Sequence, residues 1–307
     1  MSERVDAPAT VVELQVPASE LALAPTLTSG QVFRWHPSGV SWVGVVGRAV
    51  WQVDQQGERL TVTSWGEPVD VAAVQRFFRL EVALGQLYPA LRGRQPLLDA
   101  ALARFPGLRV ICQPVDDALL SFAVASANHV GRIARSLDRL AAALGPPIVT
   151  FGGAPYFALP NWEQLAEADP SWLWQVADLG YRGRVLQRLG EVLARRPAGW
   201  LAGLATLSYQ EAHQELAALP GVGPKIADCI CLYGLGFDEA VPIDSHLWAI
   251  ARTLFGPAIP TASLTPRTYR AVADLFRATF PAAPGWAQHY LFHARRLTPL
   301  AVRRQVA

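Results

Sequence analysis

The hydrophobic pattern changes near residue 68, and this change limits the folds available to the chain more than any other feature. Within residues 11–65, segments that alternate or are rich in Val and Trp predict strands over 11–16, 31–36, 40–46, 49–53 and 59–65, with turn signals such as Pro37-Ser38-Gly39 between them. From about residue 68 the pattern is helical. We therefore expect an α+β fold that is mainly α. An antiparallel β-sheet domain with flanking helices is predicted over 1–105, and a helical region over 106–307.

Composition excludes several classes of protein. Apolar residues make up 51% of the 307 residues and charged residues 17%, so an intrinsically disordered chain is excluded. No apolar run reaches the roughly 18 residues that a membrane span needs. The N-terminal segment carries acids and has no apolar core of a secretory signal. We expect an intracellular protein without membrane contact. The Arg-, Ala- and Pro-rich composition is typical of a bacterium, which would place the chain in the cytoplasm or nucleoid.

Cysteine number and glycine motifs indicate that no cofactor is needed. The three cysteines, Cys112, Cys229 and Cys231, are too few for a disulfide framework or a four-cysteine metal site. The histidines show no convincing metal-binding spacing, so no metal is predicted. Neither a GxGxxG motif nor a phosphate-binding loop is present, so nucleotide cofactors have no support.

Lysine is almost absent from the chain. Of 27 basic residues other than histidine, only Lys225 is a lysine. A GC-rich genome explains the preference for Arg but not the one lysine that remains. Arg replaces Lys wherever a fixed positive charge is enough, but not where an amine must lose its proton and act as a nucleophile. Lys225 is therefore a candidate nucleophile, although a lone surface lysine is the plainer alternative.

Two helices joined by a glycine hairpin surround this lysine. Ser208 and Glu211 form a capping box that predicts a helix to about Ala218, and a second helix is predicted from Pro224 to Gly234. The intervening glycines, Gly221 and Gly223, can turn successive backbone N–H groups outward and bind a phosphate. An ordinary tight helical corner is the alternative interpretation.

Lys225 and Asp244 form a possible catalytic pair. Lys225 stands at the second position of its predicted helix, where the positive helix end favours a neutral amine. Asp244 begins the next predicted helix, which ends at Gly256. As a cap, Asp244 would only stabilise that helix. As a buried carboxylate near an amine, it could also stabilise positive charge on a sugar ring.

The segment LPGVGPKIADCICLYGLG, followed by AVPIDSHLWAIA, closely resembles the helix-hairpin-helix DNA glycosylases with a Gly/Pro…Asp signature. More narrowly, it resembles the eukaryotic-type 8-oxoguanine DNA glycosylase/AP lyases. Segments across nearly the whole chain extend the resemblance, namely LTSGQVFRW, SFAVASANHVGRI, LGYRGR and GWAQHYLF. It implies a sheet domain followed by two helical subdomains with a DNA groove between them.

The resemblance implies a role for each matched residue. Lys225 would attack C1′ and form a Schiff base, and Asp244 would assist departure of the base; β-elimination would then nick the strand. Cys229 and Phe292 would sandwich the extruded base, and Gln288 would bind its Watson–Crick edge. Cys229 and Phe292 are also ordinary core residue types, since buried Cys and Phe are common. The residues implied to bind DNA are Asn128, His129, Arg132, Tyr181, Arg182, Gly221, Gly223 and His246.

Discrimination against guanine is implied to depend on Gly30. 8-Oxoguanine has a hydrogen at N7, and a backbone carbonyl facing N7 would attract it while repelling the lone pair of guanine. By resemblance this carbonyl belongs to Gly30, where a missing side chain allows close approach; otherwise Gly30 is a plain turn. Ala127 departs from the family, which has an asparagine there to fill the gap left by the base. This departure leaves the opposite-base preference open.

We therefore expect a monomeric, bifunctional repair enzyme that excises 8-oxoguanine from double-stranded DNA, with cytosine as the expected opposite base. One alternative is a helix-hairpin-helix glycosylase for another damaged base. Adenine-mismatch and thymine-glycol relatives carry four clustered cysteines for an iron–sulfur cluster, which this chain cannot supply. The other alternative is a non-catalytic DNA-binding module, which would need neither Lys225 nor Asp244.

Overall fold

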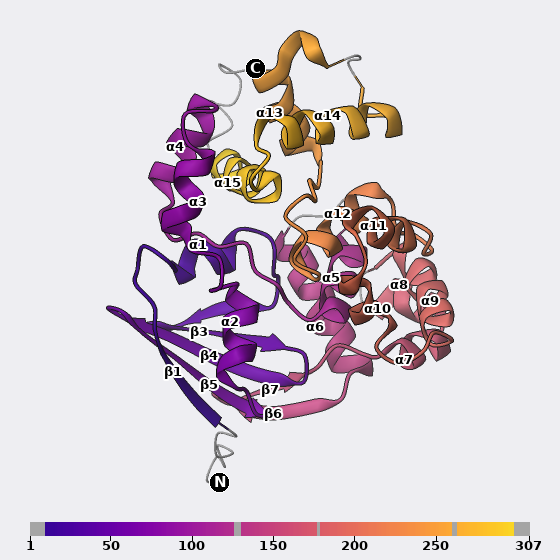
Figure 1. Ribbon diagram of the computed structural model, residues 1–307. Coiled ribbons are helices and arrows are strands. Elements are labelled where there is room, and N and C mark those ends of the chain that lie inside the picture. Colours follow the sequence, from indigo (N-terminus) through magenta and orange to yellow (C-terminus); the bar gives the residue numbers. More distant parts are fainter. Residues whose placement is uncertain (1–9, 126–129, 177–178, 260–262, 298–307) are drawn as a thin grey trace.

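The computed structural model describes residues 10–125, 130–176, 179–259 and 263–297 (Figure 1). A five-stranded antiparallel sheet comes first, in the order β1-β5-β4-β3-β2. Its strands are β1 (Thr10–Gln15), β2 (Trp35–Ser38), β3 (Ser41–Val46), β4 (Ala49–Gln56) and β5 (Arg59–Gly66). Tight turns join β2 to β5 in sequence, and Gly57 takes a positive φ of 62° in the last of them.

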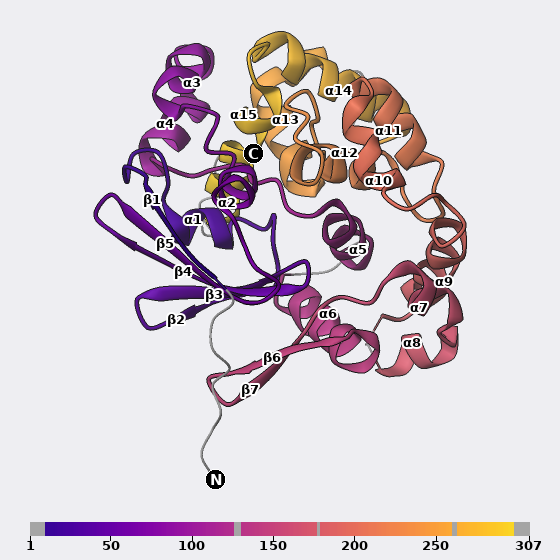
Figure 2. The same ribbon diagram turned by 60° about the horizontal axis from the view of Figure 1, so that its bottom comes forward.

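Both faces of the sheet are covered. Helix α2 (Val71–Phe78) packs on one face, where Phe77 and Phe78 join Val53 and Val62 in a buried cluster. A separate hairpin of β6 (Pro147–Phe151) and β7 (Ala154–Phe157) lies on the other face, around Trp65 (Figure 2). Because both faces are buried, the strands tolerate long Val-rich runs that a half-exposed sheet would not.

The remaining helices form the larger part of the molecule. They are α1 (Leu23–Thr28), α3 (Leu84–Leu91), α4 (Pro96–Arg104), α5 (Val115–Ala125), α6 (Val130–Leu144), α7 (Trp162–Glu167), α8 (Pro170–Val176), α9 (Arg182–Leu193), α10 (Trp200–Gly203), η1 (Leu204–Thr206), α11 (Tyr209–Ala217), α12 (Pro224–Tyr233), α13 (Ser245–Phe255), η2 (Gly256–Ala258), α14 (Pro266–Thr279) and α15 (Pro284–Arg296). Helix α5 is central, since it packs against α6, α9 and α12. Helix α15, close to the end of the chain, packs against α4 and α13 (Figure 1).

Buried polar side chains join the sheet region to the helices. The Arg109 side chain is fully buried and donates to the carbonyl oxygens of Glu20, Phe78 and Val82. Gln31 is also fully buried; its Nε2 donates to the carbonyl oxygens of Thr26 (2.9 Å) and Arg109 (2.8 Å). These bonds satisfy groups whose burial would otherwise be costly, and they hold the loop after α1 in one conformation.

The α+β fold class, mainly α, is confirmed. The predicted strand over 31–36 begins only at Trp35, because Gln31 bonds to neighbouring loops instead of a strand partner. The hairpin β6–β7 and helix α1 were not predicted. The division at residues 105 and 106 stays a prediction: β6 and β7 pack on the sheet of the first region, and α4 packs on α15. Within the described ranges, no helix has the length and apolar character required to cross a membrane.

Candidate active site

Local sequence signals build the α11–α12 hairpin as expected. Ser208 caps α11 in a capping box with Glu211, and Gly223 is the N-cap of α12, with Pro224 as its first residue. Gly221 adopts a φ of 75°, which favours glycine. Val222, between the two glycines, is buried in the helical core. The glycines therefore form an exposed turn that is anchored from beneath.

Lys225 is half-buried at the second position of α12. Its Nζ lies 5.4 Å from the centre of the Phe122 ring on α5, a cation–π distance. Cys229 follows one helical turn later on α12 and is buried. Burial raises the pKa of the Cys229 thiol to about 11, so the thiol is protonated at neutral pH. The amine therefore lies near an aromatic ring, and the thiol one helical turn along the same helix carries no charge.

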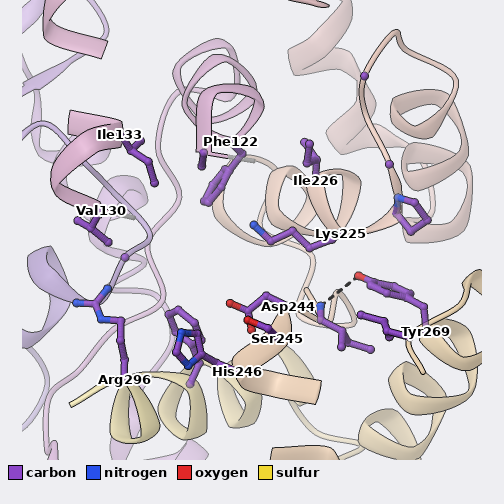
Figure 3. Close-up of a pocket in the computed structure, with 18 of the residues that line it drawn as sticks. Phe122, Val130, Ile133, Lys225, Ile226, Asp244, Ser245, His246, Tyr269 and Arg296 are labelled. Atoms are coloured by element: carbon purple, nitrogen blue, oxygen red, sulfur yellow. Dashed lines mark hydrogen bonds between the residues drawn. The ribbon is translucent and has the colours of Figure 1, made fainter. Parts of the chain in front are cut away.

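Asp244 performs the capping role that the sequence allowed and also faces the lysine's cavity. Its Oδ1 accepts the backbone N–H of Leu247 at 2.8 Å, which caps α13. Its second carboxylate oxygen has no such role in the cap. Figure 3 shows that the side chains of Lys225 and Asp244 point toward the same open space. Capping and a catalytic role are therefore compatible.

The cavity that receives these side chains measures about 870 Å³. Its walls come from distant parts of the chain: Gly30 after α1, Phe122 on α5, Lys225 and Asp244 in the helical part, and Phe292 on α15. Gly221, Gly223 and His246 also line it. The apolar lining with a few convergent polar groups is typical of a ligand-binding pocket.

The predicted base-recognition residues separate into two groups. Gly30 and Phe292 line the cavity, and the Phe292 ring meets the His246 ring edge to face at 5.8 Å. Cys229 and Gln288 are each only 2% exposed and do not line it. Gln288 Nε2 donates to the Tyr233 hydroxyl at 3.1 Å, and Tyr233 stacks on Phe122 of the cavity wall. Both side chains are therefore buried behind the residues that line the cavity.

The other predicted DNA-binding residues lie on α6 and at the start of α9. Arg132 stands on α6 between Val130 and Ile133, which line the cavity. Tyr181 is 55% exposed, and the Arg182 guanidinium lies 4.7 Å from its ring centre. Asn128 and His129, like Ala127, lie outside the described residues.

A buried network connects the nucleophile's helix to the segment before Asp244. Asp228 on α12 accepts hydrogen bonds from the hydroxyls of Tyr209 and Tyr269, and burial raises its pKa. The Tyr269 oxygen also accepts the backbone N–H of Ile243 at 3.3 Å, immediately before Asp244. Tyr269, on α14, lines the cavity as well. This network couples the positions of α12 and Asp244.

Sequence reasoning missed Tyr269, Tyr233 and Arg296 as site residues. Tyr269 and Arg296 line the cavity, and Tyr233 contacts Gln288 behind it. No local signal indicates them, because each acts across contacts between segments far apart in the chain.

Comparisons with known proteins confirm the family resemblance seen in the sequence. Residues 13–119 match the family model of the 8-oxoguanine DNA glycosylase N-terminal domain. The chain is 30% identical to the N-glycosylase/DNA lyase OGG1 of Arabidopsis thaliana over 290 residues, which cover 92% of this chain and 79% of the relative. It is 28% identical to the N-glycosylase/DNA lyase of Saccharomyces cerevisiae, with 78% and 70% covered.

Solved structures show the same fold. The structure of MBOgg1 in complex with a low-affinity DNA ligand superposes with a TM-score of 0.81 at 26% identity, covering 96% of this chain and 99% of that one. The Clostridium acetobutylicum 8-oxoguanine glycosylase/lyase, bound to duplex DNA with cytosine opposite 8-oxoguanine, gives a TM-score of 0.80 at 24% identity and covers 94% and 98%. With its sequence matched along nearly its full length, this chain belongs to the family of 8-oxoguanine DNA N-glycosylase/DNA lyases.

Proposed function

We propose that this chain excises 8-oxoguanine from double-stranded DNA and then nicks the strand at the abasic site. One observation carries the proposal: Lys225 and Asp244 point into a single cavity whose walls include Gly30 and Phe292. The reacting sugar carbon is unreachable inside a stacked duplex, so the damaged nucleotide must be extruded into such a cavity.

Lys225 is the proposed nucleophile. Its neutral Nζ forms a bond to C1′ of the extruded nucleotide while the bond from C1′ to the base nitrogen breaks, and the base leaves with that electron pair. The Asp244 carboxylate stabilises the positive charge that develops on the sugar ring. The nitrogen loses a proton, and the C1′–O4′ bond then breaks as O4′ takes up a proton, which gives a Schiff base between Nζ and C1′. Loss of a C2′ proton then expels the 3′ phosphate, which nicks the strand.

Gly30 and Phe292 are the proposed base-binding residues, with Cys229 and Gln288 as support from behind the wall. The Gly30 carbonyl accepts the N7 hydrogen that only the lesion carries. Losing one such buried hydrogen bond costs roughly 1–3 kcal/mol, so this contact alone gives limited selectivity. Gly30 is supported in this role by the bonds that immobilise its neighbour Gln31.

The proposed DNA contacts surround the mouth of the cavity. The hairpin glycines bind a backbone phosphate, as does His246. Arg132 and Arg182 contact the unpaired cytosine opposite the lesion, and Tyr181 supports the bend in the duplex. The protein acts as a monomer on one duplex, with cytosine as the preferred opposite base.

Borohydride trapping tests the proposal. A duplex with 8-oxoguanine opposite cytosine should give a covalent adduct with the wild type and none with Lys225→Gln. Lys225→Arg should keep salt-sensitive DNA affinity but lose strand nicking, because the charge remains while the nucleophile is removed. Asp244→Asn should slow base release in a folded protein.

Assays with other damaged or mismatched bases distinguish the proposed function from the two alternatives. Excision of a methylated base or a mismatched adenine in preference to 8-oxoguanine would indicate another glycosylase. Binding without any adduct would indicate a DNA-binding module. Strand nicking by the Lys225→Arg variant would refute the assigned mechanism, and equal excision opposite all four bases would refute the cytosine preference.

A further inference from the structure

Arg296 occupies the wall of the cavity beside the proposed lesion-reading residue. It is the last residue of α15, one helical turn after Phe292, so both side chains leave the same face of the helix. Its Nη2 donates to the carbonyl oxygen of Thr28, two residues before Gly30. A Cβ atom placed on Gly30 would lie 2.5 Å from Nη1 of Arg296 and 3.5 Å from the Phe292 ring. Gly30 therefore allows the guanidinium to lie directly against the backbone.

The guanidinium at this position is a strong donor. Desolvation by burial lowers the Arg296 pKa, but a guanidinium stays protonated at neutral pH. Among the described residues that line the cavity, Asp244 has the only carboxylate, and its Oδ1 caps α13. In a partly buried site, a charged donor makes stronger hydrogen bonds than it does in water. The hydrogen bond to the Thr28 carbonyl fixes one edge of the planar Arg296 guanidinium, so the guanidinium has a defined orientation.

The lesion offers a matching edge. In 8-oxoguanine the N7 hydrogen, a donor, is next to the C8 oxygen, an acceptor. The Arg296 guanidinium lies against the Gly30 backbone on the wall of the cavity. With the Gly30 carbonyl as the proposed acceptor for the N7 hydrogen, a charged donor therefore stands next to that acceptor. Guanine carries a lone pair at N7 and a hydrogen on C8, so it would meet both groups unfavourably.

We propose that Arg296 is a specificity-determining residue that donates a hydrogen bond to the C8 oxygen of the extruded 8-oxoguanine, beside the Gly30 carbonyl. This inference rests on the proposed function. Two adjacent contacts then read the two positions at which the lesion differs from guanine. The second contact adds selectivity that the carbonyl alone does not supply.

A sulfur analogue of the lesion tests the contact. 8-Thioguanine keeps the N7 hydrogen but replaces the C8 oxygen with sulfur, a weak acceptor. With the wild type, the kcat/KM of base excision should be higher for 8-oxoguanine than for 8-thioguanine. Arg296→Gln and Arg296→Ala should lower it about 10- to 100-fold for 8-oxoguanine and much less for 8-thioguanine, since only the former loses a charged hydrogen bond. Arg296→Lys should fall between these limits, because it keeps the charge without the fork.

Two controls distinguish loss of the hydrogen bond to the base from a general loss of charge or activity. Arg295→Ala removes the same charge from the neighbouring residue of α15 and should leave the oxo-to-thio ratio unchanged. Borohydride trapping on a preformed abasic site requires Lys225 but no base, so the Arg296 variants should keep it. If the wild type excises 8-oxoguanine and the variants retain its oxo-to-thio ratio, this inference fails alone. If the wild type excises neither base, the proposed function fails. Should Arg296→Ala not fold, the lysine and glutamine variants decide.

Discussion

Gly221→Ala should destabilise the protein strongly, although it adds a single methyl group to an exposed turn. The φ of Gly221 is 75°, a conformation that costs an L-residue about 1–2 kcal/mol. The new Cβ would also lie 2.1 Å from Cγ1 of Val185 on α9. Val185 is β-branched and has few alternative rotamers, so α9 or the hairpin must shift.

The two costs add to a substantial loss. Forcing extra atoms into a packed contact costs about 1–3 kcal/mol, so the free energy of unfolding should fall by about 2–5 kcal/mol in total. Gly223→Ala is the matched control. A Cβ there meets no atom within 4 Å, and φ is −85°. Because alanine is a poorer N-cap than glycine, this control should lose at most about 1 kcal/mol.

Urea denaturation followed by tryptophan fluorescence measures both variants. The midpoint of Gly221→Ala should fall well below that of Gly223→Ala. Adding Val185→Ala to Gly221→Ala should restore the part of the loss that comes from the clash, and so give a measurable coupling energy. Equal midpoints for the two glycine variants, or no coupling with Val185, would refute the assignment of strain to Gly221.

Two further predictions concern buried polar groups. Tyr269→Phe removes a donor to buried Asp228 and an acceptor for the Ile243 N–H, so the free energy of unfolding measured with urea should fall by about 1–3 kcal/mol. The variant should also slow base excision more than it slows borohydride trapping on a preformed abasic site. Unchanged stability together with an equal slowing of both reactions would contradict the coupling role. Burial lowers the pKa of His289 to about 3, below its unfolded value of about 6.5. The stability contributed by the neutral imidazole is therefore present above about pH 6.5 and is lost as the pH falls toward 3. Between pH 6.5 and 5 the free energy of unfolding should fall by about 2 kcal/mol. Denaturation between pH 7.5 and 5 should show a smaller loss for His289→Gln than for the wild type, and identical pH profiles would contradict this.

Local chemistry along the chain was enough to predict the catalytic part of the fold. The capping box at Ser208, the proline at the start of α12 and the Asp244 cap each act within one helical turn. Their helices therefore begin and end close to where the sequence predicts. Lysine chemistry likewise singled out Lys225 without any structural information, since only the amine can act as a nucleophile.

Long-range packing controls what the sequence could not reveal. The cavity brings Gly30 within contact of Phe292 and Arg296, which follow it by more than 260 residues, and no sequence window contains both sides. The strand predicted over 31–36 is shortened by the distant partners of Gln31, and β6–β7 covers a sheet face formed a hundred residues earlier. Caps and turns depend on residues close together in sequence. The wall of a binding cavity depends instead on contacts between segments that are distant in sequence and meet only in the folded protein. The amine and carboxylate could thus be identified from residue chemistry, but the groups placed to read the base became visible only once the helices were packed.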